Sequence, residues 1–129
     1  MTENELSRII IGAAIEVHRI LGPGLLEDLY EEALCHELAL QGLTVARQVP
    51  VPVMYKGRLL DKTLKLDVIV NDLVVVECKH AVKDHPVFQA QCLTYLKLTG
   101  MRLGLVIYFG LPMLKDGIHR VVNNLPDGT

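Results

Sequence analysis

Hydrophobic residues in the first third of the chain recur at the spacing of an α-helix. In residues 3–21 they follow the i, i+3, i+4, i+7 pattern, at Leu6, Ile9, Ile10, Ala13, Val17 and Leu21. The Gly-Pro-Gly segment 22–24 interrupts the pattern, and a second helical series then occupies residues 25–38. Gly42 is a suitable residue to follow the last turn of that helix. The pattern therefore predicts two helices before the first strand.

The middle of the chain changes to a period of two residues, which is typical of strands. Residues 44–55 carry valines at odd positions, and Pro50 and Pro52 remove backbone donors there, which favours an edge strand. Residues 64–70 alternate between apolar and polar, whereas residues 73–76 are continuously apolar, as in a strand covered on both faces. Turn signals separate these strands at residues 56–57 and 71–72. Three consecutive antiparallel strands are predicted.

The last third of the chain returns to helix and then to strand. Asp84 is expected to cap a helix that has Pro86 in its first turn and ends at Gly100. Residues 103–109 form another apolar strand, for which a right-handed parallel crossover is expected, and residues 117–122 can add a short strand. The predicted fold is α/β, a mixed sheet flanked by helices with the core order αβββαβ and an extra N-terminal helix.

Composition and charge place this fold in a broad class. A chain of 129 residues fits a single domain over residues 1–129, and its net charge of -2 argues against tight, nonspecific DNA binding by charge alone. The three cysteines, Cys35, Cys78 and Cys92, have no CxxC spacing, so reduced thiols are expected. The acidic N-terminus and a short apolar stretch favour no membrane association. These features predict a cytoplasmic protein.

The candidate chemistry lies at the end of the third strand. Glu77 and Lys79 are two residues apart, so their side chains leave the same face of the strand. Asp67 lies on the neighbouring strand, and its position depends on the turn between them. A two-residue turn would place Asp67 opposite Val76, whereas a three-residue loop or a bulge would place it opposite Glu77. The second arrangement is predicted.

These residues resemble a known family of enzymes. Asp67 followed by Glu77-Cys78-Lys79 is similar to the D…(D/E)xK pattern of the PD-(D/E)xK nuclease superfamily, whose restriction-endonuclease-like core has the same αβββαβ order. Leu66 replaces the proline of that pattern. The segment 24–30 resembles the motif that names the GxxExxY family, which is similar to RecB-like nucleases, and the segment 91–95 resembles its QxxxY motif.

The resemblance implies a metal site and a set of catalytic residues. Mg²⁺ or Mn²⁺ would be bound by carboxylates and one backbone carbonyl, which suits the preference of these ions for oxygen. The implied ligands are Glu27, Asp67, Glu77 and the backbone carbonyl of Cys78. Lys79 would orient a water or stabilise charge on the phosphate, together with Asp67 and Glu77. Gln91 and Tyr95, one helical turn apart, would position Lys79 or the phosphate.

Ordinary structural roles compete with each of these assignments. An acid at Glu27 would stabilise the helix dipole in any protein, and a buried Tyr30 is more often packed than catalytic. His18 also has two interpretations, a site residue or a partner of the helix dipole. A lone histidine near a helix end is more often the second. For Gln91 and Tyr95 the alternative is a helix surface and a core position. Cys78 points away from its two neighbours and is expected in the core.

Three functions follow from these interpretations. The first is a metal-dependent nuclease that hydrolyses phosphodiester bonds of DNA, with RNA as the other substrate. The second is a catalytically silent interaction module that keeps the nuclease fold, as a homodimer or as a subunit of a larger complex. The third is a purely structural ion-pair network, which predicts no stabilisation of the fold by Mg²⁺ or Mn²⁺.

Overall fold

The computed structural model describes residues 1–126, so residues 127–129 of the predicted domain lie outside the described part. The helices are α1 (Glu3–Leu21), α2 (Glu27–Leu40) and α3 (Pro86–Thr99), with the short 3₁₀ helix η1 (Leu114–Gly117). The strands are β1 (Val45–Val51), β2 (Met54–Tyr55), β3 (Arg58–Leu59), β4 (Leu64–Val70), β5 (Val74–Lys79), β6 (Leu103–Tyr108) and β7 (Ile118–Val122). Within residues 1–126, no helix is long and apolar enough to cross a membrane.

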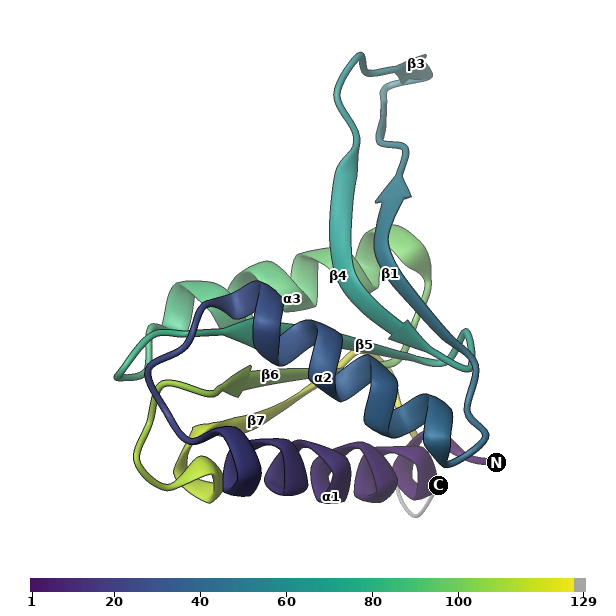
Figure 1. The fold of residues 1–129 in the computed structure, drawn as a ribbon. Coiled ribbons are helices and arrows are strands. Elements are labelled where there is room, and N and C mark those ends of the chain that lie inside the picture. The colour runs from purple at the N-terminus through teal and green to yellow at the C-terminus, as the bar shows by residue number, and fades with distance from the viewer. Residues whose placement is uncertain (127–129) are drawn as a thin grey trace.

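The main sheet has five strands in the order β1-β4-β5-β6-β7. Only β5 and β6 are parallel, and α3 connects them, as the predicted crossover requires. Helices α1 and α2 cover one face of the sheet, and α3 covers the other (Figure 1). The predicted αβββαβ order and the extra N-terminal helix are confirmed, and β7 adds the short strand that the last segment allowed.

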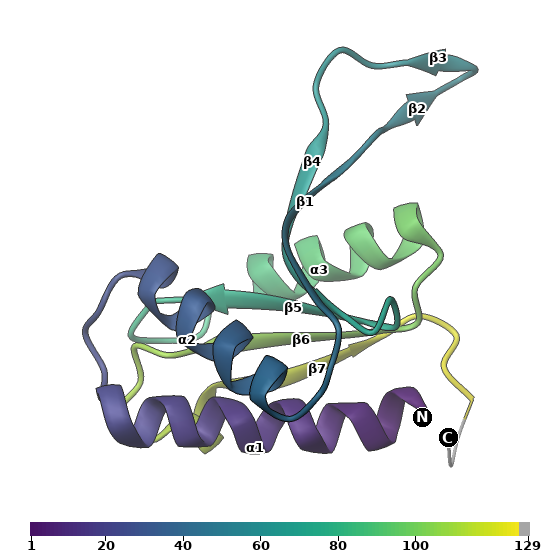
Figure 2. The same ribbon diagram turned by 45° about the vertical axis from the view of Figure 1, so that its right-hand side comes forward.

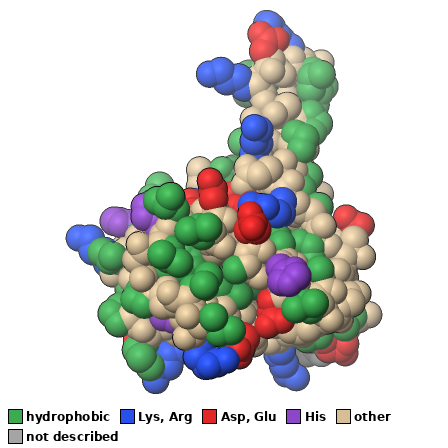
Figure 3. Space-filling view, viewed as in Figure 1, with side chains coloured by type: hydrophobic (Ala, Val, Ile, Leu, Met, Phe, Trp, Pro, Cys, Tyr) green, Lys and Arg blue, Asp and Glu red, His purple; other side chains and the backbone are tan. Residues whose placement is uncertain are grey.

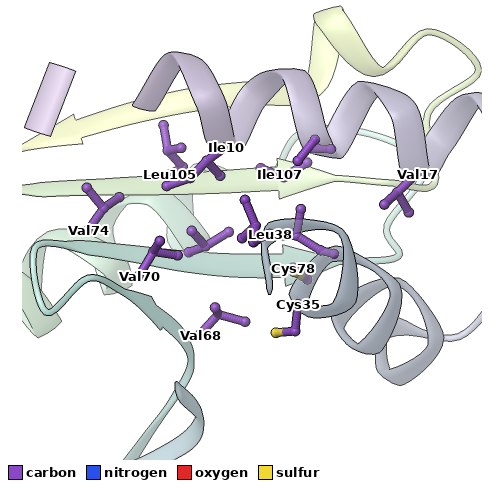
Figure 4. Packing of buried hydrophobic residues seen from close by; sticks show 14 of the residues in the cluster. Ile10, Val17, Cys35, Leu38, Val68, Val70, Val74, Cys78, Leu105 and Ile107 are labelled. Atoms are coloured by element: carbon purple, nitrogen blue, oxygen red, sulfur yellow. The ribbon is translucent and has the colours of Figure 1, made fainter. Parts of the chain in front are cut away.

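The larger part of the core lies between the sheet and the helix pair α1 and α2. Alternate residues of β4 and β5 point into it, and Ile10, Val17 and Leu38 pack on them from the helices (Figure 4). Cys78 is fully buried in this layer, as predicted, and Cys35 and Cys92 are also buried free thiols. The intervening residues of β5 face α3, so β5 is covered on both sides.

Local sequence signals explain where the helices begin and end. Thr2 and Glu5 form a capping box at the start of α1, with the Glu5 N–H donating to the Thr2 hydroxyl at 3.1 Å. Gly100 ends α3 in the left-handed conformation that glycine favours. The prediction that Asp84 caps α3 is wrong, because His85 is the N-cap residue. The Asp84 carboxylate instead pairs with His119 of β7 at 3.0 Å.

One predicted strand is shorter than expected and continues into an arm. β1 is an edge strand, as predicted, but it ends at Val51 rather than at residue 55. Beyond it, β2 and β3 form a separate two-stranded sheet, with the predicted turn at residues 56–57 between them. Residues 52–65, called the arm below, project away from the helices and the main sheet (Figure 2). The two prolines, which cannot donate ladder bonds, explain why the long strand does not continue.

Candidate active site

The loop between β4 and β5 sets the register of the candidate site. Asn71 and Asp72 both adopt positive φ, which these two residue types tolerate better than most. The strand pairs Val70↔Val74 and Val68↔Val76 leave three residues in the loop between the strands. Continued by one residue, the same register sets Asp67 opposite Glu77. Opposite residues of an antiparallel pair share a face. The hairpin therefore has the three-residue loop on which the predicted pairing of the two carboxylates depends.

Glu77 is a buried acid without a partner for one of its oxygens. Its side chain is 4% exposed, and Oε1 forms no hydrogen bond with the described residues. Burial raises the pKa of Glu77 from 4.5 to about 9, and the neighbouring Asp67 carboxylate adds to the rise. Asp67 itself is held in place, because its Oδ2 accepts a hydrogen bond from the Cys78 N–H at 3.0 Å. Such an acid pair is unfavourable unless a proton or a cation neutralises it.

Lys79 supplies a positive charge next to this pair. Its charge opposes the rise in the pKa of Glu77, which indicates that the ammonium group acts on that carboxyl. Its Nζ lies 4.6 Å from the ring centre of Phe88, on the first turn of α3, in a cation–π contact. Tyr95 of α3 packs on the hydrophobic cluster beneath that helix, on the side of the sheet that α3 covers. Burial raises the pKa of its hydroxyl, and the charges of Glu77 and Asp67 raise it further.

Glu27 lies at the start of α2 and contacts the end of β5. Its Oε1 accepts a hydrogen bond from the His80 backbone N–H at 3.2 Å and pairs with the His80 ring Nδ1 at 2.9 Å. Both contacts use the same oxygen, and Oε2 has no hydrogen-bond partner among the described residues. Glu27 is thus joined to the residue that follows Lys79. Within residues 1–126, no three acidic, histidine or cysteine side chains are close enough to form a metal-binding group.

The remaining sequence candidates lie elsewhere or serve other contacts. Gln91 is exposed on α3 and forms no hydrogen bond with the described residues. His18 is buried on α1, and its Nε2 lies 2.8 Å from the carbonyl of Leu111. The Tyr30 hydroxyl accepts a hydrogen bond from the Leu25 N–H and donates one to the Gly22 carbonyl. The His18 and Tyr30 contacts join other segments of the fold, and within residues 1–126 no hydrogen bond links any of the three side chains to Asp67 or Glu77.

Two polar contacts near the site were missed by sequence analysis. Glu31 of α2 is 2% exposed and pairs with the Arg47 Nε at 3.0 Å, while Gln48 donates to both of its oxygens. This cluster joins α2 to β1 at the base of the arm. Tyr108 of β6 donates to the Gln89 side chain and accepts from the His85 N–H, which fixes the loop before α3. Nothing in the residue spacing distinguished these side chains from ordinary surface residues.

Gly110 is a third feature that the sequence did not reveal. A Cβ at this position would lie 2.2 Å from the carbonyl oxygen of His80 and 2.5 Å from that of Ala81. The segment that follows Lys79 therefore packs directly on the Gly110 backbone. Only a residue without a side chain allows this approach.

We expect Gly110→Ala to lower the free energy of unfolding by about 1–3 kcal/mol, because the added methyl group overpacks a backbone contact. The segment carrying Lys79 and His80 must shift, so the Glu27–His80 contact should weaken as well. Urea unfolding measures the stability. The matched control is Gly12→Ala in α1, where an added Cβ meets nothing within 4 Å. That variant should be up to about 1 kcal/mol more stable. Equal effects of the two substitutions would contradict the close approach.

A comparison with known protein families identifies the superfamily of this chain. A family profile described as the PD-(D/E)XK nuclease superfamily matches residues 4–121. The matched range includes the hairpin that carries Asp67, Glu77 and Lys79, and it also includes Glu27 and α3. Neither the curated proteins nor the solved structures gave a significant match. Because the profile covers nearly the whole chain, the chain belongs to the PD-(D/E)XK nuclease superfamily.

Proposed function

We propose that the chain is a Mg²⁺- or Mn²⁺-dependent nuclease that hydrolyses phosphodiester bonds of DNA. The observation that carries this proposal is the buried Glu77 carboxyl with an unpartnered oxygen, beside the Asp67 carboxylate. A structural ion pair would place a hydrogen-bond donor on that oxygen. A buried acid without such a partner, beside a second acid, is instead typical of a site that binds a cation or a proton.

Although no three acidic, histidine or cysteine side chains are clustered within residues 1–126, the donor atoms are of the kind that a hard divalent cation binds. Asp67, Glu77 and the backbone carbonyl of Cys78 would hold the ion, with Glu27 as the acid from α2. All of these ligands are oxygens, which Mg²⁺ and Mn²⁺ prefer over sulfur or nitrogen. The unpartnered Oε2 of Glu27 is available for this role, while His80 holds the other oxygen. We infer that His80 is a positioning residue that orients Glu27.

Three side chains of the protein would position the water and the phosphate. When bound, the ion would polarise the phosphate and lower the pKa of a coordinated water. Lys79 donates hydrogen bonds to the attacking water or to a phosphate oxygen, and its contact with Phe88 limits where the ammonium group lies. The Tyr95 hydroxyl, on which the charges of Glu77 and Asp67 act, would donate to a phosphate oxygen. Gln91 would reach the DNA backbone from the exposed side of α3.

The narrower affiliation and the compartment are also part of the proposal. Gly24, Glu27 and Tyr30 support membership in the GxxExxY family and a similarity to RecB-like nucleases. Glu27 sits on the first turn of α2, and Tyr30 fixes the loop that leads to it. Three buried free cysteines fit a reducing compartment, which supports a cytoplasmic location.

Cleavage of plasmid, linear duplex and single-stranded DNA and of RNA, with Mg²⁺, Mn²⁺ or EDTA, tests the function directly. We expect metal-dependent cleavage of DNA by the unmodified chain. Asp67→Asn should lower the rate by about 10²–10³-fold, because one charged group of the site is lost. Asp72→Asn is the matched control on the same hairpin, since Asp72 is exposed in the loop and Asn tolerates its positive φ. It should retain activity within about 2-fold.

Two results would contradict the proposal. One is the absence of cleavage of every nucleic acid with either ion, which would favour the catalytically silent interaction module. The other is a similar loss of activity in Asp67→Asn and Asp72→Asn, which would indicate that the hairpin matters only for folding.

A further inference from the structure

The arm, residues 52–65, contributes nothing to either hydrophobic core of the described residues except the contacts at its base. None of its side chains belongs to the buried clusters. Instead it exposes large apolar groups near its tip, with Met54, Tyr55 and Leu59 each more than half exposed. Figures 1 and 2 show the arm standing clear of the three helices. An element that exposes this much surface without stabilising the core is suited to contacting a partner.

The charge of the arm identifies the chemistry of that partner. It carries four cations and one acid, Asp61, which gives a charge of +3. Because the whole chain has a net charge of -2, the remainder carries -5. The cations are Lys56, Arg58, Lys62 and Lys65, all exposed, and none forms an ion pair within residues 1–126. Lys and Arg side chains are visible along the arm in the space-filling view (Figure 3). A polyanion is the complementary partner.

The arm is also placed to act together with the candidate active site. β4 carries Lys65 and Asp67 two residues apart, so the cations of the arm begin one strand repeat from the acid pair. At about 3.3 Å per strand residue, the six steps of the chain from Asp67 to Asp61 span at most about 20 Å. That distance corresponds to about six base pairs of a duplex at about 3.4 Å per pair. When one phosphate is held at the acid pair, phosphates about half a helical turn away would therefore lie within reach of the arm.

The shape of the arm favours duplex DNA over RNA. It is a two-stranded ribbon near its tip, formed by β2 and β3. The major groove of B-DNA admits a two-stranded ribbon, whereas the major groove of A-form RNA is too narrow for side chains to enter. Tyr55, with the Lys56 Nζ 5.5 Å from its ring centre, adds an apolar surface beside the charges.

We propose that the arm grips duplex DNA in the major groove, with Lys56, Arg58 and Lys62 on backbone phosphates away from the one at the acid pair. The location of the cleaved phosphate rests on the proposed function, but DNA binding by the arm does not require cleavage. The arm would thus supply the positive surface that the net charge of the chain does not. Removal of three phosphate contacts should make the negative slope of log affinity against log salt less steep by about 2.7.

The test measures binding of a fluorescent DNA duplex of about 30 base pairs. Fluorescence anisotropy is the readout, and Ca²⁺ takes the place of Mg²⁺. The variant K56E/R58E/K62E should bind at least about 10-fold more weakly than the unmodified chain and show the smaller salt slope. The matched control is R8E/K97E/K115E, which makes the same charge change at exposed cations outside the arm. It should bind within about 2-fold of the unmodified chain. Thermal melting checks that both variants remain folded, since neither set of residues is buried.

The outcomes separate the arm from the catalytic proposal. Weaker binding by the arm variant alone supports the inference, even if the unmodified chain cleaves nothing. Equal binding by all three proteins overturns it, as does an equal loss in both variants, even if cleavage is observed. Sedimentation of Met54→Ser/Leu59→Ser completes the test. If the unmodified chain sediments as a dimer and this variant as a monomer, while K56E/R58E/K62E binds DNA normally, the arm contacts a second copy and the inference is wrong.

Discussion

Replacing Lys79 with Met should lower the rate of metal-dependent DNA cleavage by about 10²–10³-fold, while the fold and the metal affinity are largely retained. Lys79 is the cation whose charge acts on the Glu77 carboxyl, and a methionine of similar length keeps the apolar contact with Phe88. The loss should therefore appear in kcat more than in KM, because the ammonium group is expected to act on charge that develops during the reaction. Single-turnover cleavage with excess enzyme measures it.

Lys83→Met is the matched control for this prediction. Lys83 lies four residues further along, exposed in the loop before α3, and it forms no ion pair with the described residues. We expect its effect on cleavage to stay below about 3-fold. A loss as large as that of Lys79→Met would mean that general attraction of DNA, rather than a specific position beside Glu77, accounts for the role of Lys79.

Replacing Glu77 with Gln should abolish cleavage and at the same time stabilise the metal-free protein at alkaline pH. The pKa of this carboxyl rises from 4.5 to about 9 in the folded state because of burial and of Asp67. Near pH 4 the group is protonated in both states. Above pH 4.5 it ionises in the unfolded chain but stays protonated in the folded one, so the folded protein loses stability as the pH rises toward 9.

Each pH unit in this window should cost the unmodified protein at most about 1.4 kcal/mol, and the Glu77→Gln substitution removes that dependence. Thermal melting of the two proteins at pH 5 and pH 8 in EDTA measures the difference, which should widen at pH 8. Mg²⁺ should then raise the melting temperature of the unmodified chain but not of Glu77→Gln, since only an ion that binds the folded state stabilises it. A pH-independent difference would contradict the unpartnered burial of Glu77.

The order of the elements was predictable because each signal was local. The helical spacing up to Leu21 and the alternation from Leu64 to Val70 match α1 and β4 in both bounds. The register of the hairpin also followed from a local choice, since the observed three-residue loop is one of the two arrangements expected to pair Asp67 with Glu77. The length of β1 was not predictable in the same way. Gln48 has a positive φ, and the prolines allow the chain to leave the sheet without choosing a direction for it.

The candidate site was only partly predictable, because several of its contacts join residues far apart in the chain. Glu27 meets His80, and Gly110 packs on the backbone of His80 and Ala81, although no local pattern connects these positions. Gln91 and Tyr95 were both expected near the phosphate, but only Tyr95 packs on the hydrophobic cluster beneath α3, while Gln91 is exposed. The rotation of α3 about its axis decides which side chains face the sheet, and tertiary packing sets that rotation.

The contacts of Tyr30 have a consequence for the way a ligand would meet Glu27. The loop at residues 22–26 contains two glycines, and such a loop is ordinarily a hinge between helices. Here one hydroxyl bridges the Gly22 carbonyl and the Leu25 amide, while its ring stacks on Phe109 at 4.7 Å. The helix-borne acid is therefore already anchored to the sheet when folding is complete. The loop loses its conformational entropy during folding. Binding of a cation or a phosphate therefore would not have to compensate for that loss.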